Sequence, residues 1–518
     1  MLLFQSVHIF IFLLLICKSK ITVNGIYHKE FLISESAKMD LMQLDTELIG
    51  NLERYAEQVE DKVARLQRIV QELRQPLEAA KGIEEEYLGN PLHSFPLIRH
   101  MYQDWRYIEE FMNKTVGEEQ IDFLRKKLPE LPWQADTEEA TVAMIRMAET
   151  YGAKPWEMAQ GLIDNVAFNT TLSALDCFEI AKMYFKWGYF VEAHHWLVNT
   201  KSLLYTEYSA SYEVLGLNEK DVALLQARCL MELDLKKEAK DVLLAHPDLA
   251  ENSTNLLNQF EAIPYRAVDS SLFLTEDYKR LCRSSFSPKP SRLHCRYNST
   301  TSPFLILAPL KMEEISLEPY MVLYHDILPD KDIKQLIMLA EPQLKATEVF
   351  KEHGATRASE HTSLGTFLPF KDMDPSGEPL LDRLTQRMRD ITGMKLSDRY
   401  PDANFVKYGF GGHYSSHYDF FNASNSDTEG RGDRIATVIF YLNDAPFGGA
   451  TVFPRLNIKI PAEKGKVLFW YNMNGETHHV DPNTLHADCP VFYGSKWAMA
   501  AWIHEWDQMF IQPIYREK

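Results

Sequence analysis

The sequence predicts a multidomain protein with an α-helical N-terminal half and a C-terminal β-domain of the jelly-roll (double-stranded β-helix) type. The chain has 518 residues, more than one hydrophobic core can organise. Apolar residues follow helical spacing over residues 36–75 and 171–247. From residue 405 onwards, short β-rich segments alternate with Gly-rich or polar turns. We expect boundaries that divide the chain into 1–25, 26–140, 141–255, 256–320 and 321–518.

Residues 1–25 have the features of a cleaved secretory signal peptide. The apolar stretch from Ile9 to Cys17 is too short for a bilayer span, which needs roughly 20 residues. Val23 and Gly25 supply small residues for cleavage after Gly25. The alternative is a buried N-terminal helix. No later segment of the sequence has the length and apolarity expected of a transmembrane helix.

Sequons and cysteines agree with passage through the secretory pathway. Glycosylation is expected at some of Asn113, Asn169, Asn252, Asn298 and Asn422, although such triplets also arise by chance. Cys282 and Cys295 lie thirteen residues apart in a Pro/Ser-rich stretch, which favours a local disulfide in an oxidising compartment. Cys177 and Cys229 lie in helical patterns and are expected to be buried thiols.

The charge balance argues against one broad class of function. The formal net charge is −18, from 55 basic and 73 acidic residues. General affinity for nucleic acid needs a basic field, so we expect no nucleic-acid partner.

Residues 36–75 are predicted to form one long helix within the 26–140 domain. Apolar residues recur every seven positions, at Leu52, Val59, Leu66 and Leu73. Lys62 interrupts the second seam position, and Pro76 is expected to end the helix. The pattern is typical of a short coiled coil, so we expect a dimerisation helix. The alternative is an amphipathic helix that packs on its own domain.

Residues 171–247 contain a weak internal repeat with an offset of 46 residues. Ala181, Gly188, Ala193 and Leu197 correspond to Ala227, Asp234, Ala239 and Leu243. Each unit is predicted to be a helix, a tight turn and a second helix, similar to a tetratricopeptide (TPR) pair, and such pairs form concave surfaces for extended peptides. Aromatic grooves suit proline-rich peptides, and the rings expected to contact one are Tyr184, Tyr189, Phe190 and Trp196. The alternative is that most of these rings belong to the core.

Residues 256–320 are rich in proline and are predicted to be a linker that holds the expected disulfide. Beyond it, helical patterns cover residues near 331–342 and 378–392. The predicted strands of the β-domain are Phe405–Tyr408, Ile435–Leu442, Ala450–Phe453, Val467–Tyr471 and Trp497–Ile503.

The residues that carry chemistry lie in this β-domain. In an extended segment, His417 and Asp419 point to the same face, so an imidazole and a carboxylate converge. A second imidazole completes a two-His-one-carboxylate face that leaves positions open on iron(II) for a 2-oxo acid and O₂. We choose His486 for this role, because Lys496 follows it by ten residues. On antiparallel strands this spacing places an ammonium deeper than the metal, where 2-oxoglutarate needs a partner for its distal carboxylate. The rival ligands are His478 and His479, which lie in a polar stretch.

At these residues the chain resembles the collagen prolyl 4-hydroxylase α subunits of the iron(II)/2-oxoglutarate-dependent dioxygenase superfamily. The stretch from Tyr408 to Phe420 is similar to the catalytic signature of that family. Further matching segments are Arg434–Thr437, Gly448–Pro454, Phe469–Asn472, His486–Trp502, and, in the peptide-binding and linker regions, Asp176–Glu179, Tyr278–Cys282 and Cys295–Tyr297. The order of these segments is similar over nearly the whole mature chain.

The resemblance implies a role for each matching residue of the catalytic site. His417, Asp419 and His486 would bind iron(II), and Lys496 would pair with the distal carboxylate of 2-oxoglutarate. The reaction implied is 4-hydroxylation of prolines in X-Pro-Gly collagen-like peptides with O₂, giving succinate and CO₂. L-Ascorbate would restore iron that becomes oxidised.

Three further positions match residues around the cosubstrate. Tyr408 and Thr437 would line its pocket and donate hydrogen bonds to the same distal carboxylate. Trp502 would lie beside the metal and the substrate. A lysine at position 496 favours the collagen-type enzymes over lysyl and oxygen-sensing prolyl hydroxylases, which resemble each other in using arginine there.

The resemblance also implies a partner and a compartment. Family α subunits pair with protein disulfide isomerase, the β subunit, in an α₂β₂ tetramer in the endoplasmic reticulum lumen. In the family, the cysteine at position 489 pairs with one near the C-terminus, which this sequence lacks, so we expect Cys489 to be a free thiol. Two alternatives stay open: a non-catalytic subunit that binds proline-rich peptides, and a prolyl hydroxylase of a secreted substrate other than collagen.

Overall fold

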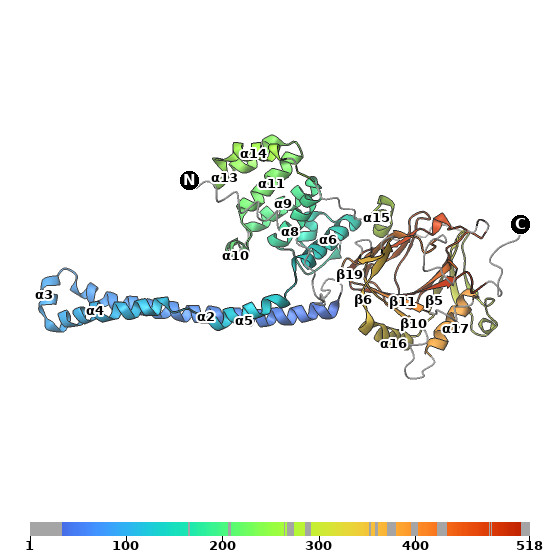
Figure 1. The fold of residues 1–518 in the computed structure, drawn as a ribbon, viewed down its shortest axis with the longest axis horizontal. Helices are drawn as coiled ribbons and strands as arrows, with labels where there is room; N and C mark the ends of the chain where they lie inside the picture. The colour runs from blue at the N-terminus through green and yellow to red at the C-terminus, as the bar shows by residue number, and fades with distance from the viewer. Residues whose placement is uncertain are drawn as a thin grey trace.

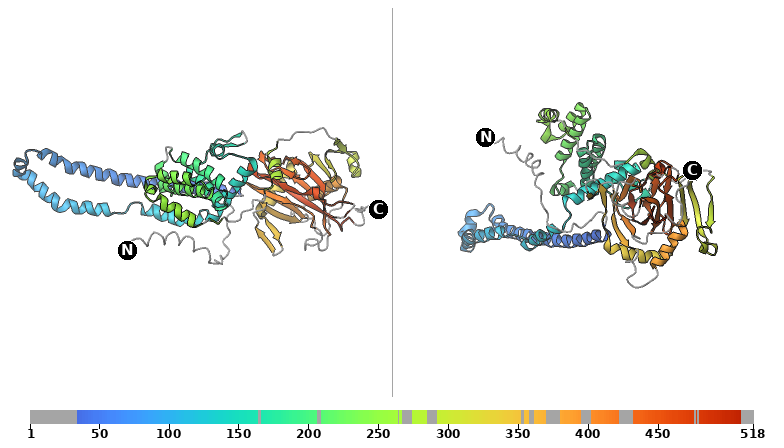
Figure 2. Two further views of the ribbon diagram at one scale, coloured as in Figure 1. Left: turned by 90° about the horizontal axis from the view of Figure 1, so that it is seen from above. Right: turned by 45° about the vertical axis from the view of Figure 1, so that its right-hand side comes forward.

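The computed structural model describes residues 34–508 apart from 164–165, 206–208, 264, 267–273, 285–291, 352–353, 358–360, 370–379, 395–401, 422–431, 476 and 478. The expected signal peptide and the sequon at Asn422 lie outside the described residues. The chain forms an elongated helical arm, a helical bundle and a β-sandwich (Figures 1 and 2). Among the described helices, none has the length and apolarity needed to cross a membrane.

The arm is built on the long helix α2 (Glu35–Ala80), and α3 (Glu84–Gly89), α4 (Pro91–Asn113) and α5 (Glu118–Lys127) return along it (Figure 1). The hydroxyl of Ser34 caps its N-terminus by accepting a hydrogen bond from the Ala37 N–H at 3.2 Å. The helix continues through Pro76, so the predicted end was wrong. A proline near a helix end removes one backbone hydrogen bond, and the neighbouring bonds keep this last turn helical.

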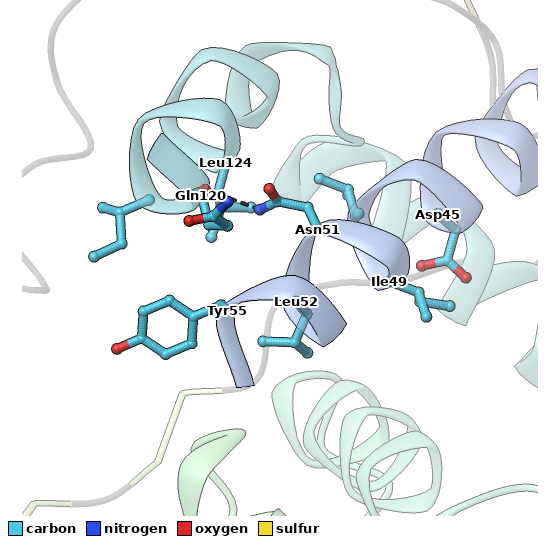
Figure 3. Close-up of a pocket in the computed structure, with 9 residues that line it drawn as sticks. Asp45, Ile49, Asn51, Leu52, Tyr55, Gln120 and Leu124 are labelled. Atoms are coloured by element: carbon cyan, nitrogen blue, oxygen red, sulfur yellow. Dashed lines mark hydrogen bonds between the residues drawn. The ribbon is translucent and has the colours of Figure 1, made fainter. Parts of the chain in front are cut away.

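Polar contacts join α2 to the returning helices. Asn51 donates to the backbone oxygen of Gln120 at 2.9 Å, beside a shallow pocket between α2 and α5 (Figure 3). Lys62 donates to the carbonyls of Met112 and Lys114 at 2.8 and 2.6 Å, where α4 ends. A cation at a helix C-terminus satisfies carbonyls that lack partners, which explains the lysine in the apolar seam. Leu52 of the heptad series stays 66% exposed, on a face that the returning helices leave open.

The helical bundle contains two helix pairs, α8 (Ala174–Lys186) with α9 (Phe190–Leu204), and α11 (Glu219–Glu232) with α12 (Lys236–Leu244). The small residues of the 46-residue repeat, Ala181, Ala193, Ala227 and Ala239, are fully buried between the helices. The turn residues Gly188 and Asp234 both have positive φ, 82° and 61°. The remaining helices of this part are α6 (Gln134–Tyr151), α7 (Pro155–Ala159), α10 (Ser209–Val214), α13 (Pro247–Ala250) and α14 (Ser253–Ala262).

The β-domain is a sandwich of two antiparallel sheets. The nine-stranded sheet has the order β3 (Cys295–Asn298), β4 (Leu310–Leu317), β5 (Tyr320–His325), β17 (Val467–Tyr471), β13 (Arg434–Tyr441), β20 (Lys496–His504), β11 (Asp402–Tyr408), β10 (Leu364–Pro369) and β6 (Lys345–Ala346). The five-stranded sheet has the order β16 (Ile458–Ile460), β15 (Thr451–Phe453), β18 (His486–Asp488), β12 (His413–His417) and β9 (His361–Thr362). Two further antiparallel pairs join β7 (Glu348–Lys351) to β8 (Gly354–Arg357) and β14 (Phe447–Gly448) to β19 (Val491–Tyr493). The five strands predicted from the sequence correspond to β11, β13, β15, β17 and β20.

Helices cover the outer face of the large sheet. Residues of α16 (Asp330–Ala340) and α17 (Leu380–Thr392) share one core with the central strands, among them Leu336, Met388, Val438 and Phe440. The inner face is therefore left for the second sheet, and the candidate site lies between the two.

The predicted linker is largely part of the folded structure. Both β3 and β4 fall inside residues 256–320, yet they form an edge of the large sheet. Helix α15 (Glu276–Arg283) also falls there and packs on the β-domain. The linker prediction was therefore wrong for these segments, because strand pairing absorbs them despite the surrounding prolines.

The disulfide prediction was also wrong. Cys282 bonds to Cys489, 207 positions away, with the two Cα atoms 5.7 Å apart. Helix α15 carries Cys282 into the core that contains Cys489, whereas Cys295 lies exposed on β3 and is a free thiol. The missing C-terminal cysteine had led us to expect a free thiol at Cys489. That prediction was wrong, because Cys489 is bonded to Cys282.

Helix α6 contains the expected domain boundary at residue 140, so that boundary does not lie between two elements. The same helix joins the helical half to the sandwich. Arg146 donates to the backbone oxygen of Gly411 at 2.9 Å, and Tyr151 donates to that of Pro490 at 2.5 Å. Gly411 has a φ of +65°, and a Cβ there would lie 2.6 Å from the Cβ of Ala143. Only glycine allows this close approach.

Candidate active site

Three candidate metal ligands meet between the two sheets. Strands β12 and β18 are antiparallel, and their register pairs His417 with His486. Asp419 lies two residues beyond the end of β12. Its carboxylate oxygens lie 3.5 Å from Nε2 of His417 and 3.8 Å from Nε2 of His486. All three ligand atoms lie within 4.8 Å of one another, so the predicted convergence is present.

Backbone carbonyls orient both imidazoles. Nδ1 of His417 lies 2.9 Å from the oxygen of Ser415, and Nδ1 of His486 lies 3.0 Å from that of Thr484. Such bonds leave Nε2 as the lone-pair nitrogen that faces the cluster. Burial and, to a smaller extent, the neighbouring His417 lower the pKa of His486 to about 4. The neutral ring that results is the form that binds metal.

The Asp419 carboxylate is oriented from the large sheet. The Thr437 hydroxyl donates to its Oδ2 at 2.7 Å, and Asn472 donates in turn to Thr437 at 2.9 Å. Burial opposes ionisation of Asp419, but His486, His417 and Arg434 outweigh it and hold its pKa below the ordinary value. Thr437 lines the cavity as predicted, but its described hydroxyl contact is to the metal ligand rather than to a distal carboxylate.

The three ligands fit iron(II). Two imidazoles and one carboxylate form the facial set typical of non-haem iron oxygenases, which leaves further positions on the ion open. The ligand atoms come from one face, and a cavity of about 500 Å³ lies in front of them. Space for a chelating cosubstrate is therefore present beside the ligands.

A buried ion pair lies at another part of the cavity wall. Nζ of Lys496 lies 2.5 Å from Oδ1 of Asp488, and the two side chains are 1% and 13% exposed. The Thr451 hydroxyl donates to Oδ1 at 2.8 Å, and the Tyr408 hydroxyl donates to Oδ2 at 2.8 Å. Burial raises the pKa of Asp488, and Lys496 with these hydrogen bonds outweighs it, so the pKa lies below its usual value.

Aromatic and basic groups form the remaining walls. The guanidinium of Arg434 lies 3.9 Å from the ring centroid of Trp502, and both residues line the cavity. On the other side, His361 stacks on Tyr414, which stacks on His417, at 3.8 and 3.6 Å between ring centroids. Burial lowers the pKa of His361 to about 3, so this ring is neutral.

Most of the residues predicted for the catalytic site lie together. Lys496, Tyr408 and Trp502 line the same cavity as the three ligands. The rival ligand His479 is exposed and lies outside the cluster, and His478 lies outside the described residues.

The predicted peptide-binding residues divide into two groups. Trp196 and Tyr184 are 1% and 3% exposed, and the hydroxyl of Tyr184 donates to Glu149 at 2.9 Å. These two predictions were wrong, because the small residues of the repeat bring the helices together over the rings. Tyr189 is exposed, and Phe190 is partly exposed with its ring against Phe185 and Tyr265.

The predicted sequons differ in the exposure of their asparagines, whereas both predicted thiols are buried. Asn113, Asn169 and Asn252 are exposed. Asn298 is only 8% exposed, and its amide donates to Thr301 and to the Tyr324 hydroxyl. A sequon serves glycosylation at the surface, so the buried Asn298 is not among the triplets suited to it. The buried thiols predicted at Cys177 and Cys229 are present, and burial raises the pKa of each to about 12.

Sequence reasoning missed several residues of the site, namely His361, Arg434, Thr451, Asn472 and Asp488. Asp488 carries a signal of local spacing, because it follows His486 by two positions and shares its strand face. Arg434, Thr451 and Asn472 lie in segments that resemble the family, although no role was assigned to them, whereas His361 lies outside those segments.

The jelly-roll fold and the ligand set define an iron(II)- and 2-oxoglutarate-dependent oxygenase. In agreement, residues 403–504 match the model of the 2OG-Fe(II) oxygenase superfamily. Residues 34–165 match the model of the prolyl 4-hydroxylase α-subunit N-terminal region. The chain belongs to the family of prolyl 4-hydroxylase α subunits.

Two curated relatives, which cover 82% and 95% of this chain, support this assignment. Prolyl 4-hydroxylase subunit alpha-3 of Bos taurus is 30% identical over 465 residues, covering 82% of this chain and 84% of the relative. Subunit alpha-1 of Homo sapiens is 27% identical over 521 residues, covering 95% and 96%. Among solved structures, a viral collagen prolyl hydroxylase from Paramecium Bursaria Chlorella virus-1 is 24% identical, covering 37% of this chain and 98% of its own, with a TM-score of 0.29.

Proposed function

We propose that the protein is the α subunit of a procollagen-proline 4-dioxygenase. It hydroxylates C4 of prolines in X-Pro-Gly peptides with O₂ and 2-oxoglutarate, giving succinate and CO₂. The observation that carries the proposal is the convergence of His417, Asp419 and His486 on one cavity wall, with Lys496 in the same cavity. Relatives that are named prolyl 4-hydroxylase subunits support the substrate class.

The side chains have distinct tasks in this reaction. Bound iron(II) supplies the activation of O₂ and the hydroxylation chemistry. His417, Asp419 and His486 hold the ion, and Thr437 keeps the carboxylate turned towards it. Asp419 and His486 are buried between the two sheets, which strengthens the electrostatic contacts in which they take part. L-Ascorbate would serve as the reductant for iron held by these residues.

Around the cavity, the residues that line it divide between cosubstrate and peptide. Lys496 and Tyr408, which donate to the carboxylate of Asp488 in this structure, are the cavity donors that a cosubstrate anion would use. Trp502, with Arg434 against its ring, forms a wall where a peptidyl proline can be positioned beside the metal.

For the 141–255 region we propose a TPR-like module that binds proline-rich segments. Of the four predicted rings, Tyr189 is 44% exposed and Phe190 lies next to it, so these two support a binding surface. The paired α8–α9 and α11–α12 helices supply the type of concave scaffold that such modules use.

For the arm we propose dimerisation through a coiled coil of α2. In support, Leu52, Val59, Val63 and Val70 are 66%, 36%, 46% and 52% exposed on a helix that already packs against α5 on another face. Burial of such residues in a second copy removes apolar surface from water.

The proposed setting is the endoplasmic reticulum lumen, with protein disulfide isomerase as the β subunit of an α₂β₂ tetramer. The word subunit in the names of the relatives supports an assembly. The Cys282–Cys489 disulfide agrees with an oxidising compartment, as do the exposed sequon asparagines at 113, 169 and 252.

The test is mass spectrometry of a Pro-Pro-Gly repeat peptide incubated with the purified assembly, iron(II), 2-oxoglutarate and ascorbate. The proposal predicts a mass increase of one oxygen atom per modified proline, coupled to succinate formation. Peptide binding without the increase would instead support a non-catalytic binding subunit. Hydroxylation of other proline-rich peptides in preference to Pro-Pro-Gly would support a secreted substrate other than collagen.

A further inference from the structure

The subsite expected to receive the distal carboxylate of 2-oxoglutarate already contacts a carboxylate of the chain itself. Lys496 bonds to one oxygen of Asp488 at 2.5 Å, and Thr451 donates to the same oxygen. Tyr408 donates to the other oxygen at 2.8 Å. Both oxygens of Asp488 are thus satisfied by the donors that would otherwise meet a ligand anion.

The position of Asp488 relative to the metal ligands agrees with occupancy of this subsite by its carboxylate. It follows His486 by two residues on β18, so both side chains point into the sandwich. Two residues of strand advance the chain by about 6.6 Å. Asp488 therefore lines the same cavity as the three ligands, displaced along the strand from His486 and in contact with the ammonium of Lys496.

We infer that Asp488 determines cosubstrate preference, because its carboxylate occupies the anion subsite formed by Lys496, Tyr408 and Thr451. Two carboxylates at one ammonium repel each other. Lys496 is 1% exposed, so solvent does little to screen that repulsion. 2-Oxoglutarate therefore binds only by displacing Asp488 from its donors, at a loss of affinity.

A 2-oxo acid with an uncharged tail avoids this conflict. It can chelate the metal through its first carboxylate and oxo group while Asp488 keeps Lys496 neutralised. The inference rests on the proposed function, since it assumes a 2-oxo acid cosubstrate at this metal. It adds that a carboxylate of the chain itself, that of Asp488, competes with the second carboxylate of 2-oxoglutarate for the same donors.

The test is calorimetric binding of 2-oxo acids to the iron(II)-loaded full-length assembly without oxygen. The proteins are wild type, Asp488→Ala, Asp488→Asn and the control Asp326→Ala. Asp326 is an exposed carboxylate of the same domain that pairs with Lys311 at 2.7 Å, so its removal changes the charge equally outside the cavity. The ligands are 2-oxoglutarate and 2-oxopentanoate, which has the same chain length and a methyl group in place of the distal carboxylate.

The expected result is a gain of about ten- to a hundredfold in 2-oxoglutarate affinity for Asp488→Ala, the range of a charge-assisted contact. Asp488→Asn removes the charge and keeps one acceptor oxygen, which can accept from Tyr408 or from Thr451 but not from both at their separate positions. It should show a gain in the same direction, which covers the case that the alanine variant does not fold. Affinity for 2-oxopentanoate should change less than threefold in every protein. A general structural effect would move both ligands together, so the ratio of their affinities is the decisive quantity.

Two results would overturn the inference in distinguishable ways. Equal 2-oxoglutarate affinity in wild type and in both Asp488 variants would contradict the role of Asp488 in cosubstrate preference. It would leave the hydroxylase assignment intact. Absence of binding of either 2-oxo acid to any of the proteins would overturn the proposed function together with the inference.

Discussion

Removal of the Cys282–Cys489 disulfide should strongly destabilise the protein. The bond closes a loop with a sequence separation of 207 and joins α15 to the strand region beside His486. In the chain-entropy account, a crosslink over a loop of that size stabilises the folded state by about 5 kcal/mol at 25 °C. This is a large share of a typical unfolding free energy of roughly 5–15 kcal/mol. Cys282→Ala/Cys489→Ala should therefore unfold at a much lower urea concentration than the wild type.

The assay is urea unfolding followed by tryptophan fluorescence, with Cys295→Ala as the matched control. Cys295 is exposed and free, so its removal should leave the unfolding midpoint unchanged. Peptide mapping without reduction should find residues 282 and 489 in one linked peptide. A destabilised Cys295→Ala protein together with a peptide that links 282 to 295 would refute the reasoning.

The remaining predictions concern the metal site and the helical bundle. His486→Ala should abolish both 2-oxoglutarate turnover and tight iron binding, measured by succinate release and metal analysis. Thr437→Val should lower iron affinity about 10–100-fold, because the hydrogen bond to Asp419 that orients the ligand is lost. Trp196→Ala should cost about 3–5 kcal/mol in the unfolding free energy, the usual cost of removing a buried aromatic ring. Tyr189→Ala should change stability by at most about 0.5 kcal/mol while weakening binding of a proline-rich peptide.

Each of these has its own control. His479→Ala removes an exposed histidine of the same segment and should keep full activity; if it is the inactive variant, the distal ligand has been misassigned. Thr392→Val removes a buried hydroxyl bonded to Met388 far from the metal, so a loss of iron affinity there would point to a global effect. A Trp196→Ala protein with normal stability and impaired peptide binding would contradict the assignment of Trp196 to the core. It would indicate that Trp196 contacts the peptide.

The sequence by itself determined those features that depend on short-range spacing. In an extended strand, residues two apart share a face, so His417 and Asp419 could be placed on one side without any knowledge of the fold. Helical periodicity located α2, and the repeat located the paired helices with their positive-φ turns at Gly188 and Asp234. Five strands of the β-domain, namely β11, β13, β15, β17 and β20, were also recognised, because turn residues bound each of them, whereas β3 and β4 were hidden in the proline-rich stretch.

The tertiary structure decided those contacts between distant segments that neither local spacing nor the resemblance had indicated. Cys282 pairs with Cys489 rather than with its near neighbour in sequence, because α15 packs on the sandwich while β3 joins a sheet edge. Trp196 is core because the opposing helices close over it. Asp488 meets Lys496 because β18 and β20 face each other across the cavity, and the identity of a partner across a core is set by packing rather than by local sequence.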